Sequence, residues 1–275
     1  MEKNFRKEKM IIDKYNKRAK KINSLLCVGL DADFAKIPKR FLSRKFPQFE
    51  FNKWIIGETH QFSSAYKLNM SIYEDRGEEG LSEMKMTTSY LQKNYPDIFT
   101  ICDAKRGDIG PYNKGYVNST FDIMGFDAMT LHPYLGKESL EPFLDRKDKG
   151  CIIICRTSNP GAGELQDLIV DSVPLWQKVA QKVVNEWNKN KNCMLVVGAT
   201  YPKEMKKIRR LVGDMTFLVP GIGAQGGDLK SVLKAGLNKK GLGLIINSSR
   251  SIIFSKNPKK EARKLYEEIR KYNFS

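Results

Sequence analysis

The stretch Phe99-Thr100-Ile101-Cys102-Asp103-Ala104-Lys105-Arg106-Gly107-Asp108 changes within ten residues from an apolar run to a densely charged one. Its first half, Phe99–Asp103, has the length and the β-branched and aromatic content of a buried strand. Its second half places two carboxylates around a lysine, which is not a pattern that stability alone selects. A buried strand that delivers charged groups at its carboxyl end is typical of an α/β enzyme.

Similar strand-like runs occur along the whole chain and alternate with segments of helical spacing. One such segment carries Leu175, Val179, Val183 and Trp187, and another is entered through Pro258. This alternation predicts a (β/α)8 TIM barrel that forms one domain over residues 1–275, with residues 1–21 as a basic N-terminal extension. The expected strands are Leu25–Leu30, Ser64–Leu68, Phe99–Asp103, Ala128–Leu131, Cys151–Arg156, Cys193–Gly198, Thr216–Val219 and Leu242–Ile246.

An open, doubly wound parallel sheet is the alternative arrangement for such an alternation. It is disfavoured because no G-x-G-x-x-G sequence follows the first strand. The chain has 275 residues, of which 41% are apolar, so it can form a substantial core. No apolar run approaches the roughly 20 residues that cross a bilayer, and Met1–Lys21 lacks the apolar stretch of a signal peptide. We therefore expect a cytoplasmic protein without a membrane partner.

Metal binding and nucleic-acid binding are both disfavoured by the composition. The five cysteines show no CxxC spacing and the chain has only two histidines, His60 and His132, so we expect no zinc site. The net charge of +17 suggests nucleic-acid binding as an alternative function. However, the lysines are scattered over several helices without an aromatic stacking motif. We interpret them as solvated helix faces and expect no nucleic-acid partner.

The ends of six predicted strands carry ionisable or phosphate-compatible residues. In a TIM barrel these ends converge on one rim, where active sites are found. The first three strands end near Asp31, near Lys67, and at Asp103 with Lys105. The other three strands are followed by Thr157-Ser158-Asn159, by Pro220-Gly221-Ile222-Gly223 and by Asn247-Ser248-Ser249-Arg250. The sequence therefore predicts one charged site at this rim.

Asp31, Lys67, Asp103 and Lys105 could form an array in which carboxylates alternate with ammonium groups. On an extended chain, residues two apart point to the same face, so Asp103 and Lys105 are expected to enter the same space. A carboxylate would repel a substrate carboxylate, and a neighbouring ammonium group would stabilise the carbanion left after carboxylate loss and protonate it. The pattern therefore suits decarboxylation; the alternative is a structural salt-bridge network that closes the barrel mouth.

The segments after the fifth, seventh and eighth strands could bind other parts of a substrate. The glycines of 220–228 can direct backbone N–H groups at an anion, and Arg250 can hold a phosphate. Thr157 and Ser158 offer polar groups for a heterocycle edge, and the loop Ser158–Val173 could close over the site as a lid. His132 is interpreted as a structural or rim residue, and His60 as an exposed or packed one.

Several motifs, in order, resemble those of orotidine 5′-phosphate decarboxylase, in its second, longer subfamily. Besides Asp103-Ala-Lys-Arg-Gly-Asp-Ile-Gly110, they are Leu26-Cys-Val-Gly-Leu-Asp31, Ala65-Tyr-Lys-Leu-Asn69, Arg156-Thr-Ser-Asn-Pro-Gly161, Val219-Pro-Gly-Ile-Gly-Ala-Gln-Gly-Gly227 and Asn247-Ser-Ser-Arg-Ser-Ile-Ile253. The resemblance covers nearly the whole chain. It implies the conversion of orotidine 5′-phosphate to UMP and CO2 in pyrimidine biosynthesis, with neither metal nor organic cofactor.

The resemblance also implies roles for individual residues. Lys105 would protonate C6 of the pyrimidine, Asp103 would face the departing carboxylate, and Lys67 with Asp31 would reach the ribose. Asp108 would cross the interface of a homodimer to complete the partner's site. The residues expected to bind the substrate are Asn69, Thr157, Ser158, Pro220, Gly223, Gln225 and Arg250. Tyr112 departs from the family, which usually has a ribose-contacting threonine there, so this contact is expected to differ.

Two further alternatives lie close to this interpretation. A 3-keto-gulonate-phosphate decarboxylase or a hexulose-phosphate synthase shares the D-x-K-x-x-D motif but binds Mg²⁺ through additional carboxylates. Lys67 and the Thr157-Ser158-Asn159-Pro160 segment favour the nucleotide enzyme instead. An inactive barrel that only binds nucleotides is disfavoured by the intact set of Asp31, Lys67, Asp103, Lys105 and Asp108.

Overall fold

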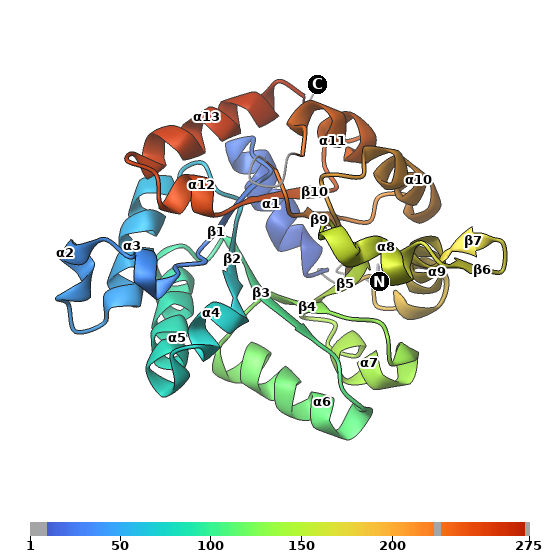
Figure 1. The fold of residues 1–275 in the computed structure, drawn as a ribbon, viewed down its shortest axis with the longest axis horizontal. Helices are drawn as coiled ribbons and strands as arrows, with labels where there is room; N and C mark the ends of the chain where they lie inside the picture. The colour runs from blue at the N-terminus through green and yellow to red at the C-terminus, as the bar shows by residue number, and fades with distance from the viewer. Residues whose placement is uncertain (1–9, 223–226, 273–275) are drawn as a thin grey trace, which may run out of the picture.

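The computed structural model describes residues 10–222 and 227–272. Within these ranges, eight parallel strands pair in the order β1-β10-β9-β8-β5-β4-β3-β2 and close into a barrel through the pairing of β1 with β10 (Figure 1). This confirms the predicted TIM barrel and excludes the open sheet. The barrel strands are β1 (Leu26–Gly29), β2 (Ala65–Asn69), β3 (Phe99–Arg106), β4 (Ala128–Leu131), β5 (Gly150–Arg156), β8 (Cys193–Val197), β9 (Phe217–Val219) and β10 (Leu244–Ser248).

Helices surround the barrel on its outer side (Figure 1). The larger ones are α1 (Ile12–Ile22), α3 (Pro47–Thr59), α5 (Gly77–Asn94), α6 (Gly110–Val117), α7 (Gly136–Leu144), α9 (Leu175–Lys182), α10 (Pro202–Val212), α11 (Leu229–Gly236) and α13 (Pro258–Arg270). The shorter ones are α2 (Lys39–Leu42), α4 (Met70–Glu74), α8 (Gly163–Gln166) and α12 (Arg250–Ile253), with the 3-10 helices η1 (Phe34–Lys36) and η3 (Pro160–Ala162) and the π-helices η2 (Asn118–Ile123) and η4 (Val183–Trp187). A two-stranded antiparallel hairpin, β6 (Ile169–Val170) and β7 (Val173–Pro174), lies outside the barrel.

The barrel strands are apolar along almost their whole length because both of their faces are covered. In β8 and β9 every residue is buried, and so are all four residues of β1 and of β4. Such strands lack the polar alternation of half-exposed sheets, as expected for a parallel barrel inside a ring of helices. Every predicted strand overlaps an observed one. Strand β3 continues past Asp103 to Arg106, and β10 begins and ends two residues later than predicted.

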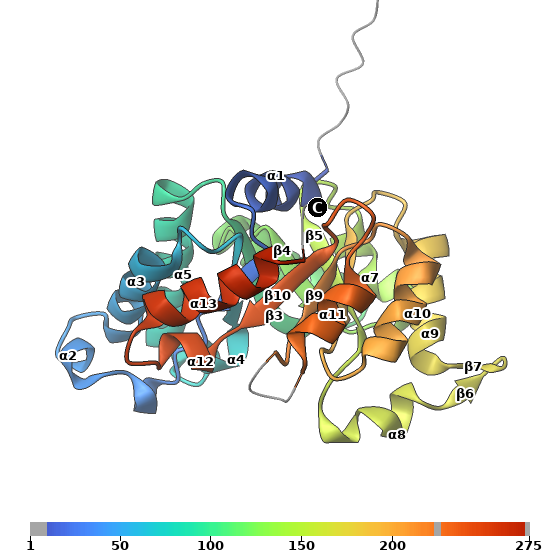
Figure 2. The ribbon, with the colours of Figure 1, turned by 90° about the horizontal axis from the view of Figure 1, so that it is seen from above.

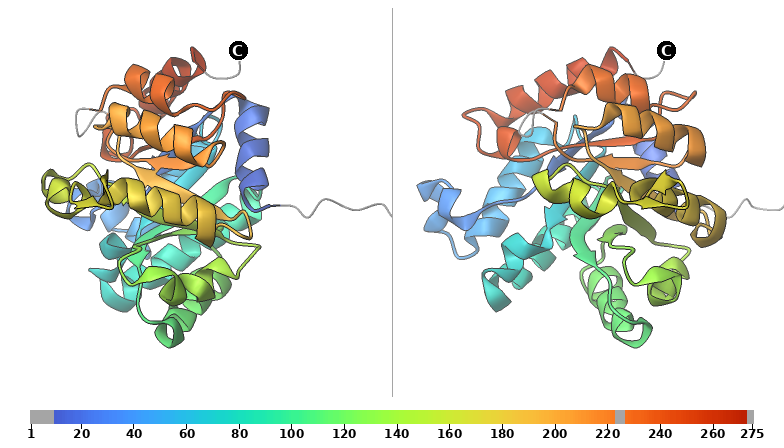
Figure 3. Two further views of the ribbon diagram at one scale, coloured as in Figure 1. Left: turned by 90° about the vertical axis from the view of Figure 1, so that its right-hand side faces the viewer. Right: turned by 45° about the vertical axis from the view of Figure 1, so that its right-hand side comes forward.

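Helix α1 packs across the amino-terminal end of the barrel (Figures 2 and 3). The fully buried Tyr15 donates its hydroxyl to the carbonyl oxygen of Leu244, at the start of β10, over 2.6 Å. Arg18 reaches the loops before β2 and β3 through the carbonyl of His60 and the carboxylate of Asp97. Residues 12–22, which lie almost entirely within the predicted basic N-terminal extension, therefore help to close the barrel.

Removing the Tyr15 side chain should destabilise the barrel strongly. We expect Tyr15→Ala to lower the free energy of unfolding by about 3–5 kcal/mol, as for other buried aromatic side chains. Tyr15→Phe loses only the hydroxyl, with its bond to Leu244 and a longer contact to the Leu25 carbonyl, and should cost about 1 kcal/mol. Urea unfolding at neutral pH measures both, with Lys17→Ala on the exposed face of α1 as the control. A Tyr15→Ala variant as stable as this control would contradict the closing role of α1.

Within the described ranges, no helix combines the length and the apolar character needed to cross a membrane.

Candidate active site

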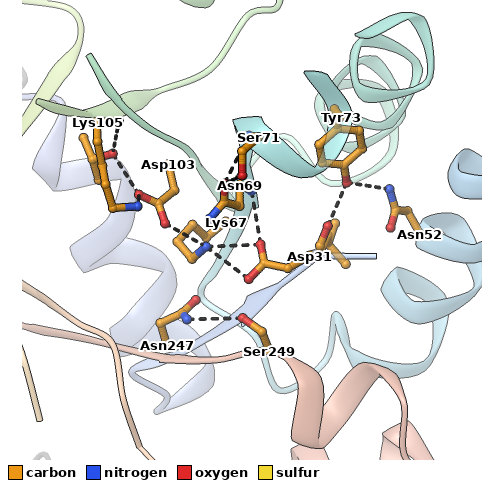
Figure 4. A network of polar contacts seen from close by, with 12 residues as sticks. Asp31, Asn52, Lys67, Asn69, Ser71, Tyr73, Asp103, Lys105, Asn247 and Ser249 are labelled. Atoms are coloured by element: carbon orange, nitrogen blue, oxygen red, sulfur yellow. Dashed lines mark hydrogen bonds and ion pairs between the residues drawn. The ribbon is translucent and has the colours of Figure 1, made fainter. Parts of the chain in front are cut away.

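Four charged side chains from the first three barrel strands meet at the carboxyl ends of those strands. Lys67 Nζ, from β2, lies 3.2 Å from Asp31 Oδ1 and 3.1 Å from Asp103 Oδ2. Lys105 Nζ lies 2.7 Å from Asp103 Oδ1 (Figure 4). Carboxylates and ammonium groups thus alternate in the order Asp31, Lys67, Asp103, Lys105, and the array has no net charge. Its charges are mutually stabilising because each lies within 4 Å of an opposite one.

The array holds both of its buried members in their charged forms. Burial acts to raise the pKa of Asp103, but the charges of Lys67 and Lys105 and the hydrogen bonds from Lys105 and Thr130 outweigh it and lower the pKa below its ordinary value. For Lys67, burial acts to lower the pKa, and the charges of Asp31 and Asp103 outweigh it and raise the pKa. Asp103 therefore remains a carboxylate and Lys67 an ammonium group at neutral pH.

The ionisation of Asp103 should make the stability of the protein depend on pH in acid. Because its pKa is lowered by folding, the carboxylate stabilises the protein above the ordinary carboxyl pKa of about 3.9, and this contribution is lost as the pH falls toward the lowered value. Between about pH 5 and pH 3 we expect wild type to lose about 1 kcal/mol more than Asp103→Asn. Urea unfolding across this range tests the prediction, and parallel pH dependences would contradict it.

Lys105 reaches Asp103 by a different route from the one that an extended strand would give. The pairing of β3 with β4 shifts register between Cys102 and Arg106, and Lys105 has φ +51°, in the left-handed region. Its backbone N–H donates to Thr130 Oγ1 over 2.9 Å, and Thr130 donates in turn to Asp103 Oδ1 over 2.9 Å. The extended-chain reasoning is therefore wrong at Lys105. A lysine held in this unfavourable conformation is a mark of functional sites.

Asp31 is fixed by the backbone that precedes it and by its neighbour strand. Its Oδ1 accepts a hydrogen bond from the backbone N–H of Asn69 over 3.1 Å. The carbonyl of the preceding Leu30 accepts one from the buried Tyr73 hydroxyl over 2.7 Å, and Asn52 donates to that hydroxyl (Figure 4). Two buried polar residues thus hold the backbone that presents Asp31 to Lys67.

The array opens into a cavity of about 550 Å³ at the carboxyl ends of the strands. The predicted site residues that line it are Asp31, Lys67, Asn69, Asp103, Lys105, Thr157, Ser158, Pro220 and Arg250. Gly223 and Gln225 lie outside the described residues. The lining also includes further residues of the predicted rim segments, namely Asn159, Gly221, Ile222, Asn247, Ser248 and Ser249. The residues that the prediction left out are Asp33, Lys36, Ile72, Ile154, Val196, Leu218 and Ser251. The charged and the phosphate-compatible segments therefore share one cavity.

The segments that follow β9 and β10 form another part of the cavity wall, and β10 pairs with β1 beside the array. Gly221 has φ +99°, a conformation that favours glycine, and its carbonyl accepts a hydrogen bond from Gly227 N–H over 3.2 Å. Arg250 is exposed at the start of α12 and lines the same cavity. A cation is thus available on this side of the cavity for an anionic group of a ligand.

Asp108 lies away from the array of its own chain. It is not among the residues that line the cavity, and its Oδ1 accepts a hydrogen bond from the backbone N–H of Ile109 over 2.7 Å. Asn113 accepts from the Asp108 N–H and donates to the Asp108 carbonyl, which fixes the loop. His132 contacts the Gly107 carbonyl through Nε2 at 2.8 Å, in keeping with its interpretation as a rim residue.

The segment after β5 contains regular structure, although the sequence suggests a single loop over Ser158–Val173. Within it the chain forms η3, α8 and the first strand of the β6–β7 hairpin. The predicted loop therefore contains short elements of its own. Its movement as a lid stays a prediction.

Together, the barrel and its charged rim define an enzyme of the TIM-barrel class that acts on an anionic small molecule. Residues 24–265 match the model of the Orotidine 5'-phosphate decarboxylase / HUMPS family. The orotidine 5'-phosphate decarboxylase of Cellvibrio japonicus is 48% identical to this chain over 237 residues, and that of Christiangramia forsetii is 47% identical over 235 residues. In each case the match covers 86% of this chain and 86% of the relative. The structure of Leishmania donovani OMP decarboxylase superposes with a TM-score of 0.87 at 37% identity, covering 97% of this chain and 100% of that one. The chain therefore belongs to the orotidine 5′-phosphate decarboxylase family, and the predicted family and enzyme class are confirmed.

Proposed function

We propose that this enzyme converts orotidine 5′-phosphate to UMP and CO2 without a metal ion or an organic cofactor. The observation that carries the proposal is the alternating array of Asp31, Lys67, Asp103 and Lys105 at the floor of the cavity. The array offers one carboxylate and one ammonium group side by side, as loss of a carboxylate followed by protonation requires. The named relatives, at 41–48% identity, support the same reaction.

In the reaction, the bond between C6 and the carboxylate carbon breaks, and CO2 leaves without the bonding electron pair. Asp103 disfavours the substrate carboxylate beside it, so part of the electrostatic repulsion is relieved as CO2 departs. The electron pair that remains at C6 is stabilised by the Lys105 ammonium group, which then transfers a proton to C6. Lys105 is left neutral and regains its proton from water. Lys67 remains charged and keeps Asp103 ionised.

The remaining walls of the cavity suit the other parts of the nucleotide. Asn69, Lys67 and Asp31 lie on the side where we place the ribose hydroxyls, and Thr157 with Ser158 would contact the pyrimidine edge. Pro220 and Arg250 would hold the phosphate, together with Gly223 and Gln225. Binding the phosphate far from C6 can contribute to catalysis by orienting the ring against the array.

We further propose that the enzyme is a homodimer in which Asp108 completes the site of the partner. Exposed apolar side chains occur in the loop of Asp108 and in the loop after β4, which His132 links to Gly107. Ile109 and Tyr112 follow Asp108, Tyr134 and Leu135 follow His132, and Tyr134 and Tyr112 are 81% and 65% exposed in the single chain. We propose that these four side chains form a patch that the subunit interface covers. Tyr112 lies within this patch, so its ring would pack at the interface instead of making the family's threonine contact.

All five cysteines are buried free thiols. Thiols without disulfide partners suit a reducing compartment, so we place the enzyme in the cytoplasm.

The experiment that tests the proposal is UV-monitored turnover of orotidine 5′-phosphate by the purified protein in the presence of EDTA. We expect full activity, with UMP as the product. Hexulose phosphate and 3-keto-gulonate phosphate with Mg²⁺ serve as the matched alternative substrates, since the family name also includes the HUMPS branch. A folded protein that turns over only these sugar phosphates would overturn the proposal.

A further inference from the structure

The short helix α8 reaches back to the segment that lines the cavity after β5. It lies at the end of the barrel opposite α1 (Figure 2). Its last residue, Gln166, is half-buried, and its side-chain amide contacts Thr157, nine residues earlier in the chain. Thr157, Ser158 and Asn159 line the cavity, whereas Gln166 does not. Gln166 is therefore placed to act on the site through Thr157.

Gln166 binds Thr157 at two points with the two ends of one amide. Its Oε1 accepts a hydrogen bond from the Thr157 backbone N–H over 2.9 Å, and its Nε2 donates to Thr157 Oγ1 over 2.8 Å. The Thr157 hydroxyl consequently uses its own proton toward Asn159 Oδ1, at 2.6 Å. These bonds fix both the backbone and the hydroxyl direction of Thr157. A side chain that lacks either a donor or an acceptor cannot make the same pair.

Arg156, the last residue of β5, holds Gln166 in place. It is only 2% exposed, and its guanidinium lies 3.9 Å from the ring centroid of Tyr201. Its Nη1 donates to Gln166 Oε1 over 3.3 Å, and its Nη2 forms an ion pair with Asp167 at 3.1 Å. Two consecutive residues at the end of α8 are thus tied to a buried cation. Because Arg156 belongs to a barrel strand, it fixes the position of the Gln166 amide relative to the barrel.

The next residue, Ser158, is positioned by the same strand end. Gly198, after β8, donates its N–H to the Arg156 carbonyl over 2.8 Å. A Cβ at Gly198 would come within 2.8 Å of Ser158 Cβ, so the two backbones pack directly against each other. Ser158 therefore packs against the Gly198 backbone on one side and follows the Thr157 backbone, which Gln166 holds, on the other.

We propose that Gln166 is a positioning residue that sets the pyrimidine-contacting edge of the cavity, Thr157 to Asn159. The proposal rests on the proposed function, in which this edge contacts the base of the nucleotide. Gln166 then affects the part of the binding free energy that comes from the base and leaves the part from the phosphate unchanged. If Gln166 only stabilised α8, its loss would weaken the base and phosphate contributions to binding alike, or would weaken neither.

Gln166→Met keeps the size of the side chain and removes both hydrogen bonds to Thr157 together with the one from Arg156, and it tests the proposal. We expect it to raise the Kd for UMP by about tenfold. The Kd for ribose 5-phosphate, which lacks the base, should stay within about twofold of wild type. Isothermal titration calorimetry measures both, and the KM for orotidine 5′-phosphate should rise with the Kd for UMP.

Gln166→Glu retains the acceptor for the Thr157 N–H and for Arg156 but loses the Nε2 donor. It should give a smaller, about threefold loss of UMP affinity and carries the test if the methionine variant does not fold. Gln92→Met is the matched control, because Gln92 is an exposed glutamine that donates to the Gly125 carbonyl. Equal losses for UMP and ribose 5-phosphate, or no loss for either, would overturn the proposal. A wild type that binds ribose 5-phosphate but not UMP would instead contradict the proposed function.

Discussion

Replacing Lys105 with alanine should lower kcat for orotidine 5′-phosphate by about three to four orders of magnitude. Lys105 Nζ is the exposed end of the array, 2.7 Å from Asp103, and is the proposed proton donor to C6. The variant loses both the proton and the positive charge that stabilises the electron pair at C6. It also leaves Asp103 with Lys67 as its remaining cationic partner in the array. Endpoint UV assays with EDTA present measure the kcat of the variant for orotidine 5′-phosphate.

The fold of the Lys105→Ala variant should be preserved, because the side chain is half exposed. Its Kd for UMP should therefore stay within about tenfold of wild type, so that the loss lies in kcat. Lys85→Ala, on the exposed face of α5, is the control and should retain full activity. A Lys105→Ala enzyme within about tenfold of the wild-type rate would remove Lys105 from the chemistry.

Mixing two inactive variants should restore activity if Asp108 serves the partner's site. Asp108→Ala and Lys105→Ala should each be nearly inactive alone, because each spoils both sites of its homodimer. In a mixed dimer, one site receives both substitutions and the other receives neither. After subunit exchange at equal concentrations, we expect about a quarter of the wild-type activity, since half of the dimers then carry one intact site of two.

The control for this experiment is the mixture of Lys105→Ala with Asp103→Asn, which lie in the same array. Every mixed dimer then carries one substitution in each site, and no activity should return. Recovery in neither mixture would mean that Asp108 acts within its own chain or not at all. The single-chain position of Asp108, outside the cavity, makes the former outcome difficult to reconcile with the structure.

The barrel was predictable because its strands are unusually uniform. Runs such as Cys193–Val197 and Ala128–Leu131 are buried on both faces, so periodicity, length and flanking residues all indicate the same element. The rim charges were predictable for the same reason, since a charged residue at the end of such a run has no structural role in the core. The domain boundaries of the full chain, residues 1–275, stay a prediction.

Three features depend on contacts that no local pattern encodes. The left-handed backbone of Lys105 follows from the Thr130 hydroxyl, which comes from a neighbouring strand. The polar Thr130 within an otherwise apolar strand was the available signal. The packing of α1 depends on Tyr15 and Ala19, which lie four residues apart. The surrounding lysines obscured this apolar spacing in the sequence. The α8 segment is stabilised by Arg156, whose burial only the fold reveals.

The hydrogen bond between Tyr15 and Leu244 has a consequence for the folding of the protein during its synthesis on the ribosome. The two residues are 229 positions apart, so the first helix is made long before its partner strand exists. At about 5–20 residues per second, roughly 10–45 s separate the synthesis of the two. During that interval β1 lacks its neighbour β10, and α1 lacks one of the strand ends to which it binds. The nascent chain therefore carries an open strand edge until translation is nearly finished, and closure of the ring is a late event in folding.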